Sequence, residues 1–380
     1  MKIIVLGSGL VGAPTAVDLA MDPRFEVTVT DVDQQAFHRL GGHPVIKTVL
    51  MDLADPGSVK KLVSDFDLVL SAVPGFMGFQ TLKAVISAGK SIVDLAFFPE
   101  DPFLLEDQAK AKNVTAIVDC GVAPGMSNLL VGHVDRLLEE TRSVLIYVGG
   151  LPQVREWPYE YKAVFSPADV LEEYVRPARY IRDGKLVVMP ALSEPERIDF
   201  PELGTLEAFN TDGLRTLART ISAPDMKEKT LRYPGHIEKM AMLRETGFFS
   251  QETIEVGGCR VRPLDVTSRL LFPKWKLQEG EGDLTVMKVV VEGRRDGHSW
   301  RYVYDLIDRF DPISRTHSMA RTTGYTASLA LRLLAHGTFT EKGIIPPEFI
   351  GRRPECVKFL LDGLRERGII YKETIEKIEV

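Results

Sequence analysis

The chain has few of the residues that build disulfide frameworks and metal sites. Its 380 residues include 3 cysteines and 7 histidines. Cys120, Cys259 and Cys356 lie far apart without a CxxC spacing, and no two histidines form an HxxxH pair. Zinc sites and redox dithiols depend on such close spacings, and disulfide-rich domains carry a dense, even set of cysteines. We therefore expect reduced, buried thiols, no disulfide and no metal.

Long apolar runs and an excess of basic charge are also missing. No stretch of about eighteen apolar residues could span a membrane, and the chain begins at once with a strand-like run instead of a signal peptide. The 47 Lys+Arg and 53 Asp+Glu give a net charge of −6 without a polybasic segment. This balance argues against binding to a nucleic-acid backbone. We expect a cytoplasmic protein that binds a small molecule, and neither nucleic acid nor membrane.

The chain does contain a glycine-rich loop of the kind that binds dinucleotide phosphates. An apolar run from Lys2 to Leu6 leads into Gly7-Ser8-Gly9-Leu10-Val11-Gly12, and a helical stretch follows. Gly7 permits a tight turn, Gly9 lets the backbone approach a pyrophosphate, and Gly12 lets the helix pack closely on the sheet. The N–H groups and macrodipole of the helix N-terminus favour the phosphates. An ordinary βαβ unit with a glycine-rich turn is the alternative.

A second apolar run ends at Asp31, which bears on the choice of cofactor. A carboxylate at the end of the second strand accepts hydrogen bonds from both ribose hydroxyls and repels a 2′-phosphate. The sequence therefore predicts NAD and not NADP, with Asp31 and the neighbouring Val32 at the ribose. A helix N-cap or a solvated acid is the alternative for Asp31, and Asp33 is more typical of such a cap.

Alternating β-like and helical segments continue to about residue 121 and predict a Rossmann-type, doubly wound parallel sheet. Six strands are expected, at 2–6, 27–30, 48–51, 68–70, 91–93 and 115–118. Ligands of open α/β sheets bind at the carboxyl ends of the strands. Further cofactor candidates at these ends are Asp52, Ala72, Val73, Pro74, Asp94 and Leu95. Asp52 would approach the adenine and residues 72–74 the nicotinamide ribose, with simple loop roles as the alternative.

After Cys120 the pattern changes, and a chain of this length can bury two cores. We expect an NAD-binding domain over 1–122 and a substrate-binding domain over 123–315. Helices within 316–367 are expected to pack back on the first domain, because small residues in the first of them permit close approach.

The second domain is expected to be α+β, built on a mixed or antiparallel sheet. Hairpin turns are predicted at Asp183-Gly184 and Asp296-Gly297. Across the second turn, 284–291 is expected to pair with 300–304. Because such a sheet is a common dimer surface, we expect a homo-oligomer, first of all a homodimer.

The densest set of functional candidates outside the glycine loop begins at Arg232. If a helix begins near Pro234, then His236, Lys239 and Met240 fall on one face of it. Arginine can clamp a carboxylate, histidine can move protons near neutral pH, and lysine can add charge or a hydrogen bond. A solvated basic helix start is the alternative.

Three other positions are weaker candidates. Tyr161 lies in an aromatic segment where packing alone is an adequate explanation. Glu194 stands in an expected turn and could bind a cationic amine. Asn210-Thr211-Asp212-Gly213 is typical of an Asx turn before a helix, with a substrate loop as the other interpretation.

These segments resemble the saccharopine dehydrogenase-like family, and within it the branch that oxidises the ε-amine of lysine. The resembling segments run in order through nearly the whole chain, at 7–12, 121–126, 145–150, 206–213, 229–236, 319–323 and 346–348. In some relatives the fifth strand ends in Asp-Leu-Gly-Gly, whereas this chain has Asp94-Leu95-Ala96-Phe97. The larger side chains would reshape the nicotinamide pocket.

The resemblance implies NAD-dependent oxidation of L-lysine at C6 to an imine, which hydrolyses to 2-aminoadipate 6-semialdehyde and cyclises to piperideine-6-carboxylate. An alkylammonium does not readily release hydride, and removing its proton costs roughly 4–5 kcal/mol at pH 7. We expect His236 to transfer the proton, Arg232 to bind the carboxylate and Tyr161 or Glu194 to orient the amine. Lys239 is a further catalytic candidate.

Two other functions stay open. One is an imine-reducing enzyme of the saccharopine reductase or carboxynorspermidine type, whose product carries more carboxylates and needs several arginines around one pocket. Only Arg232 is conspicuous in this sequence, and Asp31 disfavours NADP. The other is a non-catalytic NAD-binding protein that retains the fold without turnover.

Overall fold

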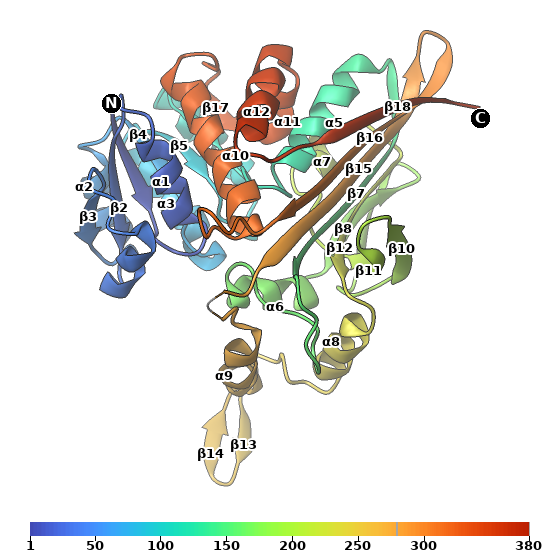
Figure 1. Cartoon of the computed structure of the whole chain (residues 1–380), viewed down its shortest axis with the longest axis horizontal. Coiled ribbons are helices and arrows are strands. Elements are labelled where there is room, and N and C mark those ends of the chain that lie inside the picture. Colours follow the sequence, from blue (N-terminus) through green and yellow to red (C-terminus); the bar gives the residue numbers. More distant parts are fainter. Residues whose placement is uncertain (279, 380) are drawn as a thin grey trace. The chain divides into compact units, whose positions relative to one another are not determined.

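The computed structural model describes residues 1–278 and 280–379. The chain divides into two compact units (Figure 1). The first contains Met1–Leu137 and Met319–Tyr371, and the second contains Leu138–Ser318 and Lys372–Val380. Each unit is built around its own large sheet, so the α/β fold class expected from the sequence is confirmed.

A seven-stranded parallel sheet forms the first unit, in the order β17-β6-β5-β4-β1-β2-β3. Its strands are β1 (Lys2–Leu6), β2 (Glu26–Asp31), β3 (Lys47–Leu50), β4 (Leu68–Ser71), β5 (Ser91–Asp94), β6 (Thr115–Ile117) and β17 (Gly343–Ile345). The order reverses between β1 and β4, which makes this the switch point of a doubly wound sheet. The six expected strands are confirmed. Strand β17 was not expected, because three residues are too few to carry a periodic signal.

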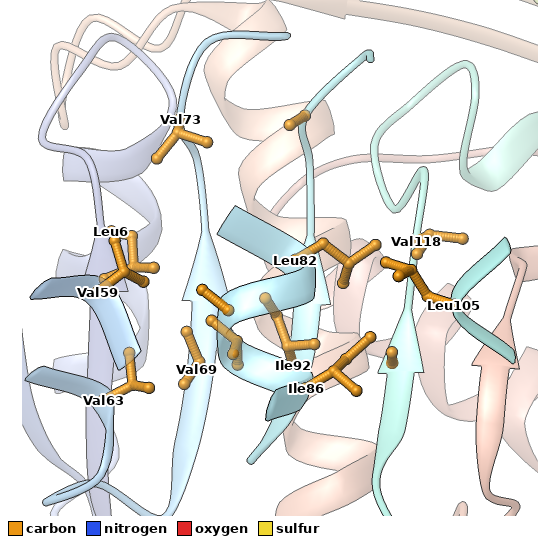
Figure 2. Packing of buried hydrophobic residues seen from close by; sticks show 14 of the residues in the cluster. Leu6, Val59, Val63, Val69, Val73, Leu82, Ile86, Ile92, Leu105 and Val118 are labelled. Carbon is orange, nitrogen blue, oxygen red and sulfur yellow. The ribbon is translucent and has the colours of Figure 1, made fainter. Parts of the chain in front are cut away.

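Helices cover the apolar strands of this sheet, which read as continuous hydrophobic runs because both faces are buried. Figure 2 shows one face, where Leu6 of β1 lies near Val59 of α2, and where Leu82 and Ile86 of α3 lie near Ile92 of β5. The helices of the first unit are α1 (Gly12–Ala20), η1 (Gln34–Leu40), α2 (Pro56–Val63), α3 (Gly75–Ser87), η2 (Pro102–Leu105), α4 (Glu106–Ala111), α5 (Met126–Leu137), α10 (Ser318–Ala335), α11 (Pro347–Gly351) and α12 (Pro354–Glu366).

Helix α10 lies against α1 within the first unit. At Gly324 of α10 a Cβ atom would lie 2.2 Å from Thr15 Oγ1 of α1. Asp18 of α1 accepts hydrogen bonds from Arg332 Nη1 at 2.8 Å and from Arg367 Nε at 2.6 Å. A small residue and a buried ion-pair network thus hold the C-terminal helices against α1. The same division places α5 in the first unit, beyond the boundary expected at residue 122.

The second unit holds a mixed sheet with the order β10-β11-β12-β7-β15-β16-β18, to which β8 and β9 are added beside β12. Its strands are β7 (Glu140–Pro152), β8 (Ala178–Arg182), β9 (Lys185–Met189), β10 (Glu196–Phe200), β11 (Gly204–Asn210), β12 (Asp225–Arg232), β15 (Asp283–Arg295), β16 (His298–Arg309) and β18 (Lys372–Ile378). Strands β12 and β7 are parallel, and the other pairs are antiparallel.

Both predicted hairpins of this unit are confirmed. Strands β8 and β9 meet at Asp183-Gly184, and β15 and β16 meet at Asp296-Gly297. Val291 pairs with Tyr302, as expected for 284–291 against 300–304. Asp183 has a φ of 50° and Asp296 a φ of 51°, which the Asp-Gly pairs of such turns tolerate.

The helices of the second unit surround an aromatic core. They are α6 (Pro167–Val175), α7 (Leu217–Thr220), α8 (His236–Glu245) and α9 (Pro263–Trp275), and a small separate sheet is formed by β13 (Ile254–Val256) and β14 (Cys259–Val261). Tyr174 of α6, Met240 of α8 and Trp275 of α9 are fully buried in one cluster with Tyr161 and Phe209. This core fixes α6 and α8 beside the end of β12.

The three cysteines are free thiols, two of which are buried. Burial was expected for all of them, and it is wrong for Cys259, which is exposed. Cys259 lies in the two-stranded sheet β13–β14, which is too small to bury its own side chains. Within the described residues, no helix has both the length and the apolar character needed to cross a membrane.

Replacing Gly324 with alanine tests the α1–α10 contact. Gly324→Ala is expected to lower the free energy of unfolding by about 1–3 kcal/mol, because the new methyl group forces the two helices apart. Urea unfolding measures the change. The control is Gly57→Ala in the first turn of α2, where a Cβ would come no closer than 3.4 Å to Asp55. That variant should be neutral or more stable, by up to about 1 kcal/mol; equal losses in both would contradict the packing argument.

Candidate functional site

The glycine loop of the first unit joins β1 to α1, and each glycine meets a different environment. Gly7 has a φ of 101°, and a Cβ on it would lie 2.7 Å from the Ala72 carbonyl oxygen. On Gly12 a Cβ would lie 2.1 Å from the Gly7 carbonyl oxygen. On Gly9 it would meet no described protein atom within 4 Å. Backbone conformation and packing therefore require Gly7 and Gly12, whereas Gly9 leaves open space beside the N-terminus of α1, where a phosphate fits.

Asp31 stands at the end of β2 and holds the glycine loop in place. Its Oδ2 accepts the Ser8 N–H at 2.7 Å, and its Oδ1 accepts the Asp33 N–H at 2.9 Å. Each carboxylate oxygen has a second lone pair for a ribose hydroxyl. Val32 is exposed beside it. Asp33 caps η1 by accepting the Gln35 N–H at 2.9 Å, which confirms the cap expected there.

The other cofactor candidates lie along the same edge of the parallel sheet. Asp52 accepts the Ala54 N–H at 2.8 Å in the turn after β3. Residues 72–74 connect β4 to α3. Asp94 is buried at the end of β5, and the following Leu95 donates its N–H to the Ser71 carbonyl at 2.9 Å. These residues lie at the strand ends where open α/β sheets bind dinucleotides, and the contact of each residue with a cofactor stays a prediction.

Arg232 of the second unit is buried and already paired. Its side chain is 2 % exposed, and its Nη2 lies 2.5 Å from Glu173 Oε2 of α6. Its Nε donates to the Tyr174 hydroxyl at 3.2 Å, and its guanidinium carbon lies 4.6 Å from the centre of the Tyr161 ring. A substrate carboxylate that binds Arg232 would have to replace or join Glu173.

His236 begins α8 with both ring nitrogens bonded. Nδ1 lies 2.8 Å from the Tyr159 carbonyl oxygen, and Nε2 lies 2.9 Å from the Tyr174 hydroxyl. Because a carbonyl only accepts, Nδ1 carries the proton, and Nε2 accepts from Tyr174. Burial, and secondarily the Arg232 charge, lower the pKa of His236 to about 3. His236 is therefore a neutral link in a chain of hydrogen bonds, and its proton-transfer role stays a prediction.

Tyr161 and Lys239 lie close to this pair. The Tyr161 ring is 5.0 Å from the His236 ring and 5.4 Å from that of Trp275. Burial raises the pKa of the Tyr161 hydroxyl. Lys239 Nζ donates to the Gly235 carbonyl at 3.0 Å, so the ammonium is bound one helical turn back. The structure thus gathers four of the five catalytic candidates.

Glu194 has a different set of partners. Its carboxylate lies 2.7 Å from Lys227 Nζ and 2.6 Å from Arg182 Nη2, and it accepts a hydrogen bond from Asn210 Nδ2 at 3.2 Å. These contacts, the Lys227 bond first, lower the pKa of Glu194 to about 2. Two cations already neutralise the carboxylate, so an amine would have to compete with them.

The sequence interpretation missed Glu173, Tyr174, Trp275 and Glu228. Glu228 is 5 % exposed, and burial raises its pKa to about 8. One signal was available: Glu228, Thr230 and Arg232 alternate along β12, so one face of a buried strand is polar. Glu173 and Tyr174 gave no such signal, because they lie on α6 and reach Arg232 only through tertiary packing. Among the described residues no group of three or more His, Cys, Asp or Glu could hold a metal ion.

Gly9→Ala is expected to weaken dinucleotide binding while leaving the fold intact. The methyl group would enter the open space beside the loop and hold a pyrophosphate away, which costs about tenfold or more in Kd, roughly 1.4 kcal/mol. Fluorescence titration with reduced dinucleotides measures binding, and thermal unfolding measures stability. Gly12→Ala is the comparison variant, in which the clash with Gly7 should lower stability. Equal unfolding temperatures for the two variants would contradict the assignment.

The buried His236 predicts loss of stability in acid. Its pKa is 6.5 when unfolded and about 3 in the fold, so the unfolded chain takes up a proton first. The stabilisation is complete above pH 6.5 and declines as pH falls toward 3, by up to about 1.4 kcal/mol per pH unit. Urea unfolding between pH 3 and 4.5, below the range in which the raised pKa of Glu228 contributes, should show a shallower slope for His236→Gln. The surface variant His38→Gln is the matched control; a wild-type slope in His236→Gln would refute the claim.

By sequence, the chain is similar to curated proteins that are named for aminoadipic semialdehyde and for saccharopine. It is 25% identical to mouse mitochondrial alpha-aminoadipic semialdehyde synthase over 97% of this chain and 47% of that protein, so it spans about half the length of that relative. It is 26% identical to the saccharopine dehydrogenase [NADP(+), L-glutamate-forming] of Saccharomyces cerevisiae, over 98% of each chain. The apo, histidine-tagged saccharopine dehydrogenase (L-Glu forming) from Saccharomyces cerevisiae has the same fold, with a TM-score of 0.80 at 20% identity over 99% of both chains.

Two family models match consecutive parts of the sequence. The saccharopine dehydrogenase NADP binding domain matches residues 3–117. The saccharopine dehydrogenase C-terminal domain matches residues 121–369, which is more than half of the chain. Taken with the nucleotide-type sheet and the buried polar strand, these matches show that the chain belongs to the saccharopine dehydrogenase family.

Proposed function

We propose that this chain is a dehydrogenase of the lysine 6-dehydrogenase type, which oxidises the ε-amine of L-lysine with NAD. The products are the C6 imine, its hydrolysis product 2-aminoadipate 6-semialdehyde and the cyclic piperideine-6-carboxylate. The observation that carries the redox part is the glycine loop, where Gly7 and Gly12 are packed and Gly9 faces open space. A homodimer built on the mixed sheet is part of the same proposal.

The choice of NAD is supported by Asp31. The name of the yeast relative specifies NADP(+), yet this chain has a carboxylate at the ribose end of β2, held by the Ser8 and Asp33 N–H groups. A 2′-phosphate placed there would meet a negative charge at close range. A bound nicotinamide would accept the hydride, and the residues that would hold its dinucleotide are the loop 7–12, Asp31 and the strand ends at 72–74 and 94–95.

The choice of a small amine is supported by the family and by chain length. The relatives are named for saccharopine and for aminoadipic semialdehyde. The alignment with the yeast enzyme runs over 449 positions, whereas this chain has 380 residues. The yeast enzyme therefore contains internal segments that this chain lacks. A chain with fewer segments suits the smaller substrate lysine better than saccharopine, which carries an additional dicarboxylate arm.

The roles of individual side chains remain predictions. Arg232 would bind the substrate carboxylate in exchange for Glu173, and Tyr161 would lie beside it. His236 would fix the Tyr174 hydroxyl or transfer a proton. Lys239 and Glu194 would adjust the charge around the amine.

Oxidation of saccharopine itself is the second candidate. It is supported by the yeast relative, which this chain matches over 98% of both lengths. A third possibility is a dinucleotide-binding protein without turnover. Substrate and cofactor assays separate all three.

The purified protein is expected to reduce NAD with L-lysine, and to do so with at least roughly tenfold higher kcat/KM than with NADP, about 1.4 kcal/mol of discrimination. Absorbance of the reduced nicotinamide measures the rate, with ornithine, saccharopine and other amino acids as parallel substrates. Turnover of saccharopine but not lysine would establish the second candidate instead. No turnover with any amine, together with measurable dinucleotide binding, would establish the third candidate, a dinucleotide-binding protein without turnover.

A further inference from the structure

We propose that Glu228 is the base that takes the proton from the substrate ammonium group. This inference rests on the proposed amine oxidation and names the residue that makes it possible. A primary alkylammonium must lose a proton before its carbon can release hydride, so the site needs an acceptor. Neither the sequence nor the family comparison singles out Glu228.

The histidine of the site is badly suited to this task. Both nitrogens of His236 are bonded inside the protein, to Tyr159 and Tyr174. Accepting a proton on Nε2 would break the bond from Tyr174 and place a positive ring near the Arg232 guanidinium. Lys239 and Arg232 are cations and have no lone pair to offer when charged. The carboxyl groups of this region are the better acceptors, and of these Glu173 is paired with Arg232 and Asp212 with Arg179.

Glu228 lies on the same face of β12 as Thr230 and Arg232, and all three are at most 5 % exposed. One of its oxygens, Oε2, is fixed by the Thr211 hydroxyl at 2.5 Å and by the Gly213 N–H at 3.1 Å. The other oxygen, Oε1, makes no hydrogen bond with the described residues. The carboxyl group is thus held in one orientation with one oxygen available.

The loop that holds Glu228 is shaped around the carboxyl group. A Cβ on Gly213 would lie 2.3 Å from the Glu228 carboxyl carbon, so a side chain at 213 would displace the acid. Thr211 also bonds to Thr230 at 2.8 Å, which ties the loop after β11 to β12 at this level. For segment 210–213 the sequence allowed two interpretations, an Asx turn or a substrate loop. In the structure this segment supports the buried carboxyl group of Glu228.

Burial and the negative charges that face Glu228 raise the pKa of its carboxyl group into the neutral range. Glu173 approaches from α6 and Asp212 from the loop after β11, and Asp212 is paired with Arg179 of β8 at 2.8 Å. The neighbour of Glu228 on β7 is the apolar Ile146. Burial first, and then the Glu173 charge, raise the pKa of Glu228 to about 8 against the opposing Thr211 bond. The positive charge of an incoming ammonium would lower the pKa of Glu228 and favour its ionised form, which can accept a proton.

The proton and electron balance of the step is simple. An N–H bond of the ammonium breaks, its electron pair stays on nitrogen, and the proton forms an O–H bond on Glu228 Oε1. The nitrogen pair would then form the C=N bond as the C6–H bond breaks, and a bound NAD would supply the acceptor for the hydride and its electron pair. Glu228 afterwards returns its proton to water.

The test is the pH profile of kcat for Glu228→Gln, measured with lysine and NAD on the full chain. We expect a loss of roughly 100-fold or more near neutral pH. The rate of the variant should then rise with pH toward 10, because lysine increasingly supplies its own neutral amine. Thr211→Val removes one donor from Oε2, so its inflection should move to higher pH while activity persists. Glu255→Gln makes the same chemical change on the exposed β13 and should leave the profile as in the wild type.

Unfolding and binding measurements separate catalysis from structure. The Glu228 pKa is 4.5 when unfolded and about 8 in the fold, so the wild type loses stability as pH rises between these values. Glu228→Gln should remove that loss and keep dinucleotide affinity. An active wild type with an unchanged profile in Glu228→Gln would overturn this inference alone, as would a variant that is inactive at every pH and no longer binds NADH. A wild type that oxidises no amine would overturn the proposed function, and this inference with it.

Discussion

The second unit depends on a guanidinium that is buried at the end of a strand. Arg232 is 2 % exposed, and such a charge is tolerated only with a counter-charge and full hydrogen bonding. Glu173 supplies the counter-charge, Tyr174 accepts from Nε, and the Tyr161 ring lies under the guanidinium. These partners fix α6 and the aromatic core, and through Tyr174 they hold Nε2 of His236, whose tautomer is set by the Tyr159 carbonyl. One ion thereby organises most of the candidate site.

The same burial decides which groups can titrate. Removing water lowers the pKa of His236 and raises that of Glu228, so the histidine is held neutral and the acid comes into the neutral range. As free side chains, histidine would titrate near neutral pH and glutamate in acid; in this fold Glu228 titrates near neutral pH and His236 in acid. A base of the second unit is therefore better sought among its carboxyl groups than among its histidines.

The first unit follows its sequence closely, because its rules are local. Gly7 forms the turn, Gly12 packs against Gly7, and Asp31 holds the loop. The closest contacts lie within the first βαβ unit, apart from the Ala72 carbonyl beside Gly7. Six strands and the two hairpins of the second unit were likewise predictable from runs, alternation and turn residues. Strand β17 was not predicted, because it is short and joins the sheet from a distant part of the chain.

By itself the sequence determined the parallel sheet, the glycine loop with Asp31, the hairpins and the presence of Arg232 and His236 near one another. Only the tertiary structure decided that Glu173 pairs with Arg232 and that both ring nitrogens of His236 are bonded. It also decided that Lys227 and Arg182 bind Glu194, and that Cys259 is exposed. The physical reason is range. Turns and periodicity act over a few residues, whereas desolvation and ion pairing depend on which distant side chains share the interior.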